Sequence, residues 1–170
     1  MRQSVLACGI LVCSVCTWGQ ASAQEHATYL VVEVDRFVGE ANVAFPADYQ
    51  IGLVEDIIRE LKHTFKSVQI VREGETLPEG KAVLRLTGKV TEFKPGSKVK
   101  RYLIGYGVGA TVVKAQVKFI DAKSANVILD RELKGVTWIG VMGGNSEGAG
   151  HQIAKTIVDT ARIENLIGQQ

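Results

Sequence analysis

Hydrophobic and polar residues alternate most regularly between residues 111 and 120. One side of this segment carries only hydrophobic residues, namely Val113, Ala115, Val117 and Phe119. The residues between them are mostly polar, and one buried face beside one wet face indicates a strand that pairs antiparallel with a neighbour. Polar residues 121–126 predict a turn, after which residues 127–133 predict the partner strand, extended by residues 136–141.

Three further segments have the patterns of strands. Residues 28–37 are rich in β-branched side chains and hydrophobic on both faces at their start, which is typical of an interior strand. Residues 67–71 predict a short strand. Residues 82–93 alternate between a hydrophobic side and a side of charged and hydroxyl groups, and Pro95 and Gly96 end the pattern.

Two segments have the spacing of amphipathic helices. The first opens at residues 46–48, with Asp48 as the expected N-cap. Its hydrophobic residues recur every three or four positions and predict one core-facing side: Ile51, Val54, Ile57, Ile58, Leu61 and Phe65. The second helix starts at His151 after a glycine-rich stretch, and its expected core-facing side comprises Ala154, Ile157, Val158, Ala161 and Leu166.

The order of these elements predicts the fold class. A strand and a helix come first, a group of strands follows, and a helix ends the chain. We therefore expect an α+β domain with a mainly antiparallel mixed sheet of about five strands and both helices packed on one face.

The first 23 residues have the pattern of a secretory signal peptide. Arg2 supplies the positive charge, residues 5–15 are almost all hydrophobic, and Ala21 and Ala23 form the small-x-small pattern after which a signal peptidase cleaves. Residues 24–170 would then form a single mature domain of 147 residues, enough for its own hydrophobic core. The alternative is a lipoprotein modified at Cys8, but only seven residues precede that cysteine.

Composition narrows the chemistry that the mature chain could perform. All three cysteines, Cys8, Cys13 and Cys16, lie within the predicted signal peptide, which excludes disulfides and thiolate chemistry after cleavage. The near balance of 20 basic and 18 acidic residues argues against a nucleic-acid partner. No segment after residue 23 reaches the ~20 consecutive hydrophobic residues that a membrane-spanning helix needs.

The residues that usually carry catalysis form no convincing arrangement. The three histidines, His26, His63 and His151, are not spaced as metal ligands, so we expect no metal and no cofactor. Glu33 and Asp35 share one face of the first predicted strand, and paired carboxylates can perform acid–base chemistry when one of them is buried. The simpler interpretation is a solvated edge or an ion pair with Arg85 or Lys89, so a non-enzymatic role is favoured.

The first candidate binding segment combines basic and aromatic side chains with glycines at positions 105, 107 and 109. Its candidate residues are Lys98, Lys100, Arg101, Tyr102 and Tyr106. A dinucleotide site needs Gly-x-Gly-x-x-Gly before a helix, whereas a strand follows here. Two interpretations stay open: a glycine-punctuated strand or hairpin, and an interfacial segment whose basic residues contact anionic head groups while the aromatic residues insert shallowly.

The second candidate segment is the glycine-rich stretch 143–150 before the last helix. Free N–H groups at a helix N-terminus can bind an anion, and the candidate residues for this role are Gly144, Asn145, Ser146 and His151. The stretch lacks the Gly-Lys-Ser/Thr ending of a phosphate-binding loop. The other interpretation is a surface loop whose Asn145 or Ser146 caps the helix.

Several motifs together resemble a bacterial envelope family, domain-of-unknown-function 4410. They are the runs 32–37 (VEVDRF), 88–93 (GKVTEF) and 101–110 (RYLIGYGVGA), Asp121-Ala122, and a glycine cluster leading into Ile153-Ala154-Lys155. The resemblance covers most of the mature chain and implies no catalytic residue, because the family has no established activity. Members often carry Thr-Gly after the Asp-Ala pair, where this chain has Ser124-Ala125, and many look like lipoproteins, whereas this leader favours release.

The element order is also similar, more distantly, to small domains of envelope assembly lipoproteins, such as the curli secretion lipoprotein and activators of penicillin-binding proteins. Such a likeness of fold does not fix function.

These observations favour an exported envelope protein, periplasmic or associated with the outer membrane. We expect it to bind a protein partner or the outer-membrane surface. The alternative is a small-ligand or anion-binding protein, or a hydrolase, that uses the glycine-rich loop before the last helix. Self-assembly through exposed strand edges is a third possibility, and the oligomeric state stays open.

Overall fold

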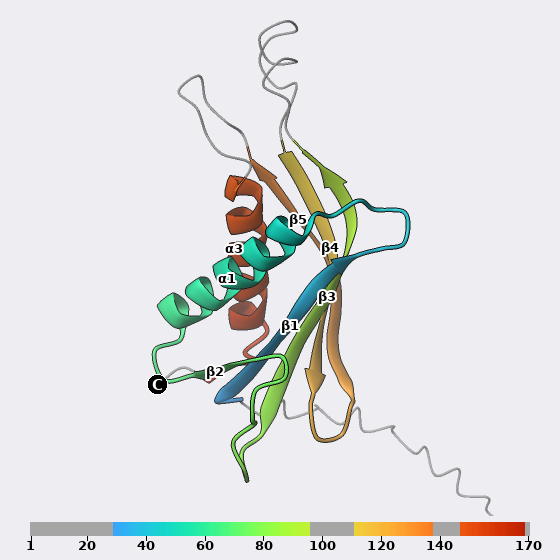
Figure 1. Cartoon of the computed structure of the whole chain (residues 1–170). Helices are drawn as coiled ribbons and strands as arrows, with labels where there is room; N and C mark the ends of the chain where they lie inside the picture. Colours follow the sequence, from blue (N-terminus) through green and yellow to red (C-terminus); the bar gives the residue numbers. More distant parts are fainter. Residues whose placement is uncertain (1–28, 96–110, 138–146, 169–170) are drawn as a thin grey trace, which may run out of the picture.

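The computed structural model describes residues 29–95, 111–137 and 147–168 (Figure 1). The elements follow the predicted order: β1 (Val31–Gly39), α1 (Ala47–Thr64), β2 (Gln69–Arg72), β3 (Val83–Lys94), β4 (Thr111–Asp121), β5 (Val127–Thr137) and α3 (Glu147–Ile163). The five strands form one sheet in the order β2-β1-β3-β4-β5. β1 therefore lies inside the sheet, as its hydrophobic composition predicts.

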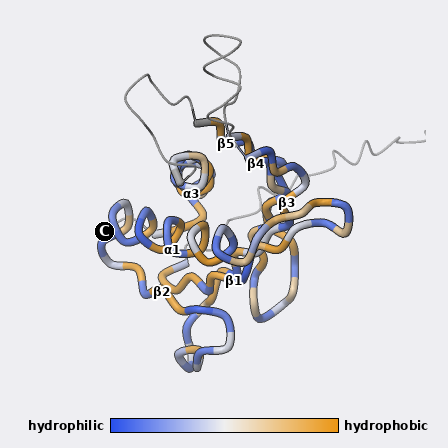
Figure 2. Tube along the Cα trace, turned by 45° about the horizontal axis from the view of Figure 1, so that its top comes forward, coloured by the Kyte–Doolittle hydropathy of each residue, from blue (hydrophilic) through white to orange (hydrophobic). Residues whose placement is uncertain are grey.

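The sheet is mixed, and its longest pairings are antiparallel. β1 pairs parallel with β2 and with β3, whereas β4 pairs antiparallel with both β3 and β5. Both helices lie on one side of the sheet and pack against each other (Figures 1 and 2). This arrangement confirms the predicted α+β class.

The core lies between the two helices and the sheet. Its sheet side consists of alternate strand residues that are fully buried, among them Leu84, Leu86, Val117 and Phe119. The helices contribute Ile57, Leu61, Ile153 and Ile157, which are 0% or 1% exposed. α1 alternates between hydrophilic and hydrophobic residues along its length in Figure 2, which is the pattern of a helix with one buried side. The predicted period-2 and helical patterns thus identify most of the core correctly.

The first turn of α1 differs from the prediction in two respects. Pro46 occupies the N-cap position and makes no side-chain cap hydrogen bond, so Asp48 is not the cap but lies within the first turn. There its negative charge faces the positive end of the helix dipole. Ile51 is 63% exposed rather than buried, although Tyr49 in the preceding turn packs against the core.

The uncovered face of the sheet has its own small hydrophobic cluster at one end. Val31, Val71 and Val83 are buried there, and Leu77 of the connection between β2 and β3 packs against them. The rest of this face presents mostly charged and polar side chains, with Val112 and Ile120 of β4 among them.

The turn between β4 and β5 has the predicted extent and an unexpected backbone. Ala125 adopts a positive φ of 58°, the left-handed region that favours glycine. The Asp121 carboxylate stabilises the turn by accepting hydrogen bonds from the backbone N–H (2.6 Å) and the hydroxyl (2.8 Å) of Ser124. The chain therefore keeps a glycine-type turn geometry with an alanine.

The end of the described chain is tied to the start of β1. Tyr29 forms a parallel bridge with Ile167, and the backbone N–H of Gly168 donates to the Tyr29 carbonyl at 3.0 Å. The Tyr29 hydroxyl donates to Asp121 Oδ2 at 2.8 Å. Burial and this carboxylate raise the pKa of Tyr29 to about 12, so the hydroxyl stays protonated at physiological pH.

Candidate functional site

Both candidate binding segments are joined to the same end of the sheet. We call it the loop end, where β3 ends at Lys94, β4 begins at Thr111 and β5 ends at Thr137. Lys94 pairs with Val112, and Thr111 pairs with Thr137, so the three strand ends are neighbours. Residues 96–110 connect β3 to β4, and residues 138–146 connect β5 to α3.

Most of the candidate residues themselves lie outside the described residues. Those of the first segment are Lys98, Lys100, Arg101, Tyr102 and Tyr106, and those of the second are Gly144, Asn145 and Ser146. The structure therefore describes their attachment points and, of the candidates, only His151. From the sequence, the two segments were interpreted as alternative binding sites. The strand order instead joins them to adjacent strand ends.

An aromatic cluster lies on the helix-covered side of the loop end. Phe93, near the end of β3, packs against Phe45 and Tyr49, with ring centroids 5.1 Å and 4.8 Å apart. Phe45 and Tyr49 flank the start of α1, so the cluster ties the helix to the end of β3. The tilted and edge-on ring arrangements are the favourable ones for aromatic pairs. The cluster therefore fixes the end of β3 at the point where the first candidate segment begins.

A charge cluster lies on the uncovered side of the loop end. Glu92 accepts from Lys94 Nζ and Lys114 Nζ, each at 2.5 Å. These two ammonium groups lower the pKa of the Glu92 carboxyl to about 2, so it stays ionised. Lys134 pairs in register with Lys114 across β4 and β5. Glu132 of β5 also acts on Lys114, so the group comprises three lysines and two glutamates and carries a positive excess.

His151 lies in the second turn of α3 rather than at its start. The helix begins at Glu147, four residues before the predicted start. His151 Nδ1 is 3.7 Å from Glu60 Oε1 of α1, and the histidine side chain is 45% exposed. Its ring is therefore placed by a contact between the two helices.

The carboxylates on β1 are joined to an arginine on β3. Glu33 Oε2 accepts from Arg85 Nε at 2.8 Å, and Asp35 Oδ1 is 4.0 Å from the same nitrogen. The ion pair that the sequence offered as one interpretation is therefore confirmed for Arg85, but the site is not solvated, because the Glu33 side chain is only 8% exposed. Burial and the charge of Glu33 raise the pKa of Asp35.

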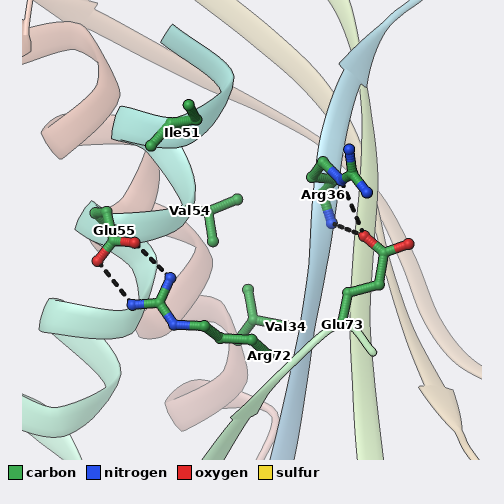
Figure 3. A pocket seen from close by; sticks show the side chains of 7 residues that line it. All are labelled: Val34, Arg36, Ile51, Val54, Glu55, Arg72 and Glu73. Carbon is green, nitrogen blue, oxygen red and sulfur yellow. Dashed lines mark hydrogen bonds and ion pairs between the residues drawn. The ribbon is translucent and has the colours of Figure 1, made fainter. Parts of the chain in front are cut away.

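A shallow depression of about 180 Å³ lies between α1 and the edge of the sheet (Figure 3). Val34 and Val54 line it, and Ile51 projects at its rim. Both terminal nitrogens of the Arg72 guanidinium donate to the Glu55 carboxylate, with Nη2 3.0 Å from Oε2. Arg36 Nε donates to Glu73 Oε2 at 3.3 Å. All four charged residues lining it are thus paired with one another, so the depression has no uncommitted charge with which to recognise a ligand.

Sequence reasoning missed this depression and both of its ion pairs. The Arg72–Glu55 pair joins residues 17 positions apart, and the Arg36–Glu73 pair joins residues 37 apart. Such pairs depend on how far β2 and α1 extend along β1, which no local pattern encodes. A charged residue directly after a hydrophobic strand, as Arg72 is, was the one available signal.

In residues 29–95, 111–137 and 147–168, no group of three or more His, Cys, Asp or Glu residues could hold a metal ion. Among the helices of that same part of the chain, none is long and hydrophobic enough to cross a membrane.

The profile of the family described as Domain of unknown function (DUF4410) matches residues 52–159, more than half of the chain. The chain belongs to this family, as its motifs predicted. No curated protein matches the sequence.

Solved structures share the fold at low sequence identity. A PelC dodecamer from Paraburkholderia phytofirmans has a TM-score of 0.55 at 18% identity, over 76% of this chain and 87% of that one. Protein XCC0632 from Xanthomonas campestris, of family DUF330, has a TM-score of 0.56 at 13% identity, over 84% and 88% of the two chains. The hypothetical protein CT253 from Chlamydia trachomatis has 0.52 at 12% identity, over 82% and 98%.

Proposed function

We propose that this member of the DUF4410 family is an exported protein of the bacterial envelope that acts by binding and not by catalysis. The observation that carries the proposal is the loop end, where two segments rich in glycine, one of them basic and aromatic, join adjacent strand ends. The ends of β3, β4 and β5 position both segments, and the aromatic cluster fixes the end of β3 where the first segment begins. Proteins commonly present binding loops from such rigid elements.

The binding surface of this proposal comprises Lys98, Lys100, Arg101, Tyr102 and Tyr106, and its partner is an envelope protein or the outer-membrane surface. The lysines of the loop end continue the basic character of the segment, since Lys94, Lys114 and Lys134 outnumber the two glutamates beside them, Glu92 and Glu132. Basic and aromatic side chains together suit anionic partners, because the charges attract and the rings bury hydrophobic area.

Proximity labelling and pull-down in the native envelope test the proposal. We expect the triple variant Lys98→Ala, Lys100→Ala, Arg101→Ala to lose partners that the wild type captures. The matched control is Lys66→Ala, Lys81→Ala, Lys123→Ala, which removes three exposed positive charges at the opposite end of the sheet. Unchanged capture by the first variant, or equal loss in both, would contradict the proposal.

Vesicles separate a membrane surface from a protein partner. If the partner is the outer-membrane surface, the wild type binds anionic vesicles in a salt-dependent way and the triple variant does not. Capture of a protein with no vesicle binding assigns the loop end to a protein partner instead.

Export itself rests on the leader sequence. We propose cleavage after Ala23, so that the exported form starts at Gln24. Mass spectrometry of the protein from the envelope fraction should give the mass of residues 24–170 without a lipid. A diacylated Cys8 would replace release by membrane attachment.

The second candidate function is binding of a small anion by the stretch before α3. Its specific support is that α3 begins at Glu147, directly after Gly144, Asn145 and Ser146, so free helix N–H groups adjoin the stretch. A thermal-shift screen of phosphates, nucleotides and sugars tests it. A ligand at 100 times its Kd stabilises the folded protein by about 2.7 kcal/mol. If no compound raises the melting temperature, binding of an envelope partner through the loop end is the better proposal.

Self-association is a further part of the proposed contact function. The structure of similar fold from Paraburkholderia phytofirmans is a dodecamer. A member of this fold that acts by binding is therefore able to present its surface in several copies, which raises avidity without any new contact.

A further inference from the structure

The two edges of the sheet differ in length. β2 forms one edge with four residues, whereas β5 forms the other with eleven. Within the described part of the chain, no strand pairs with the outer side of β5. Short edge strands are one way to prevent pairing with other chains, and a long one offers a row of free backbone donors and acceptors.

Charged side chains alternate along β5 in a self-complementary way. Glu132 and Lys134 lie on the uncovered face of the sheet, opposite Gln116 and Lys114 of β4, and Leu133 lies between them on the helix-covered face. Lys134 is exposed and directly opposite another lysine, a placement that like charges disfavour within a sheet. Lys114 is already paired with Glu92, so Lys134 is the lysine that a negative charge beyond the edge would neutralise.

We propose that β5 pairs antiparallel with β5 of a second copy of this chain, with Leu133 opposite the partner's Leu133. This register places Glu132 opposite the partner's Lys134, and two-fold symmetry repeats the same pair with the roles exchanged. The two sheets then continue into one, with the helices of both copies on the same face. The proposal deepens the self-association part of the proposed function and rests on it.

Neighbouring registers of the same symmetry are unfavourable. Centring the pairing on Glu132 or on Lys134 places a charge opposite its own copy. Centring it on Arg131 places Asp130 opposite the partner's Glu132. Shifting the pairing of the two β5 strands by one residue would place the helices of the second copy on the opposite face of the joined sheet, because side chains alternate between faces. Centring on Glu132 does bring Lys134 opposite the partner's Asp130, but it also sets the two Glu132 carboxylates against each other. Among these registers, the Leu133 register alone pairs opposite charges without any like-charge pair, and each opposite pair stabilises a sheet.

Charge reversal tests the register in the exported chain, with sedimentation equilibrium measuring the dimer Kd. We expect Glu132→Lys and Lys134→Glu each to raise the Kd at least tenfold, because two attractive pairs become repulsive at once. The double variant Glu132→Lys, Lys134→Glu should return the Kd to near the wild-type value. In the Lys134→Glu variant the new carboxylate lies opposite Lys114 of the same copy, so the thermal midpoint of the variant should not fall. A raised Kd with an unchanged midpoint then reports lost pairing and not unfolding.

The matched control is Glu79→Lys, Lys81→Glu, which reverses two exposed charges of the same spacing in the β2–β3 connection and should leave the Kd unchanged. If the single reversals have no effect, or if the double variant stays monomeric, the β5 pairing is wrong, although the chain could still associate in another way.

If the wild type is monomeric at every concentration, both the β5 pairing and self-association are wrong. The contact function is tested separately, by partner capture through Lys98, Lys100 and Arg101.

A disulfide gives a second measurement of the same register. Opposite residues of antiparallel strands have Cα atoms about 4.5–5.5 Å apart, within the range that a disulfide spans. The exported chain from Gln24 onward has no cysteine of its own. We expect Leu133→Cys to form a covalent dimer on oxidation, whereas Arg131→Cys, opposite the partner's Gly135 in this register, should not. Equal crosslinking of the two variants would overturn the register.

Discussion

The two faces of the sheet are built on different principles. The helix-covered face is hydrophobic and closely packed, and its central strand residues, such as Leu86 and Phe119, are fully buried. The uncovered face consists mostly of charged residues held by one another, as in the pairs Lys118–Asp130 and Arg85–Glu33. Burial of hydrophobic area stabilises the fold far more than exposed ion pairs do. The covered face therefore determines stability, which leaves the residues of the uncovered face and the edges free to differ for binding.

Adjacent residues of β4 give the sharpest test of this difference. Phe119 faces the helices and is 0% exposed, whereas Lys118 faces the other way and pairs with Asp130 at 3.3 Å. We expect Phe119→Ala to lower the free energy of unfolding by about 4 kcal/mol, because it leaves a cavity in the core. Lys118→Ala should cost at most about 1 kcal/mol. Urea unfolding of both variants measures this, and similar losses would refute the contrast between the faces.

Gly135 of β5 packs closely against the backbone of α3 on the covered face. A Cβ there would lie 2.6 Å from the Ala149 carbonyl oxygen and 2.8 Å from the backbone nitrogen of Ile153, so α3 would have to move. We expect Gly135→Ala to cost about 3 kcal/mol in the same measurement.

The control for this variant is Gly52→Ala in α1, where a Cβ would meet nothing within 4 Å. This change should stabilise the protein by up to about 1 kcal/mol, because alanine favours a helix over glycine. If both alanines stabilise the protein, α3 does not pack on β5 as closely as the structure has it.

The Arg85–Glu33 pair is the exception on the uncovered face, because Glu33 is buried. We expect Arg85→Ala to cost about 2 kcal/mol, since it leaves a buried carboxylate without its cation. Arg36→Ala removes a comparable but exposed pair with Glu73, whose side chains are 74% and 49% exposed, and should cost no more than about 0.5 kcal/mol. Equal losses would mean that Glu33 is solvated and the uncovered face is uniform.

The sequence predicted the covered face better than anything else, for a physical reason. Side chains that pack on a helix or on a second layer must recur with the period of their own element, so Val113 to Phe119 and Val54 to Leu61 are legible locally. Ile51 breaks the rule because burial there depends on how far the sheet extends beneath the helix, which is a tertiary property. Asp48 was misplaced because Pro46 fixes where the helix starts.

The candidate site was predictable only in part. Composition singled out residues 94–110 and 143–150 as unusual. It could not show that β3, β4 and β5 bring the attachment points of these segments together at the loop end. That adjacency follows from strand order, which pairs residues far apart in the sequence. The turn at Ala125 is a similar case, since its positive φ of 58° is imposed by the flanking strand pairing and by Asp121 rather than by a glycine.

The smallest expected effect concerns Asp35, the less buried carboxylate beside Arg85. Burial and the charge of Glu33 outweigh Arg85 and raise the pKa of Asp35 in the folded state. A carboxyl with a raised folded-state pKa favours folding when neutral, so this contribution is complete below the unfolded pKa of about 3.9 and is lost as the pH rises through the folded value. We therefore expect Asp35→Asn to unfold at a higher temperature than the wild type at pH 7, with the difference vanishing below about pH 3.

Glu92 provides the control of opposite sign on the same face. Lys114 and Lys94 lower its pKa to about 2, so its ionised form stabilises the fold above the unfolded pKa, and this stabilisation is lost as the pH falls toward 2. Glu92→Gln should thus unfold at a lower temperature than the wild type at pH 7 and converge with it in acid. Melting curves between pH 2 and pH 7 compare the two variants. If Asp35→Asn and Glu92→Gln both lower the melting temperature at pH 7, the attraction of Arg85 for Asp35 outweighs burial and the charge of Glu33. The two carboxylates would then both be stabilised in their ionised forms.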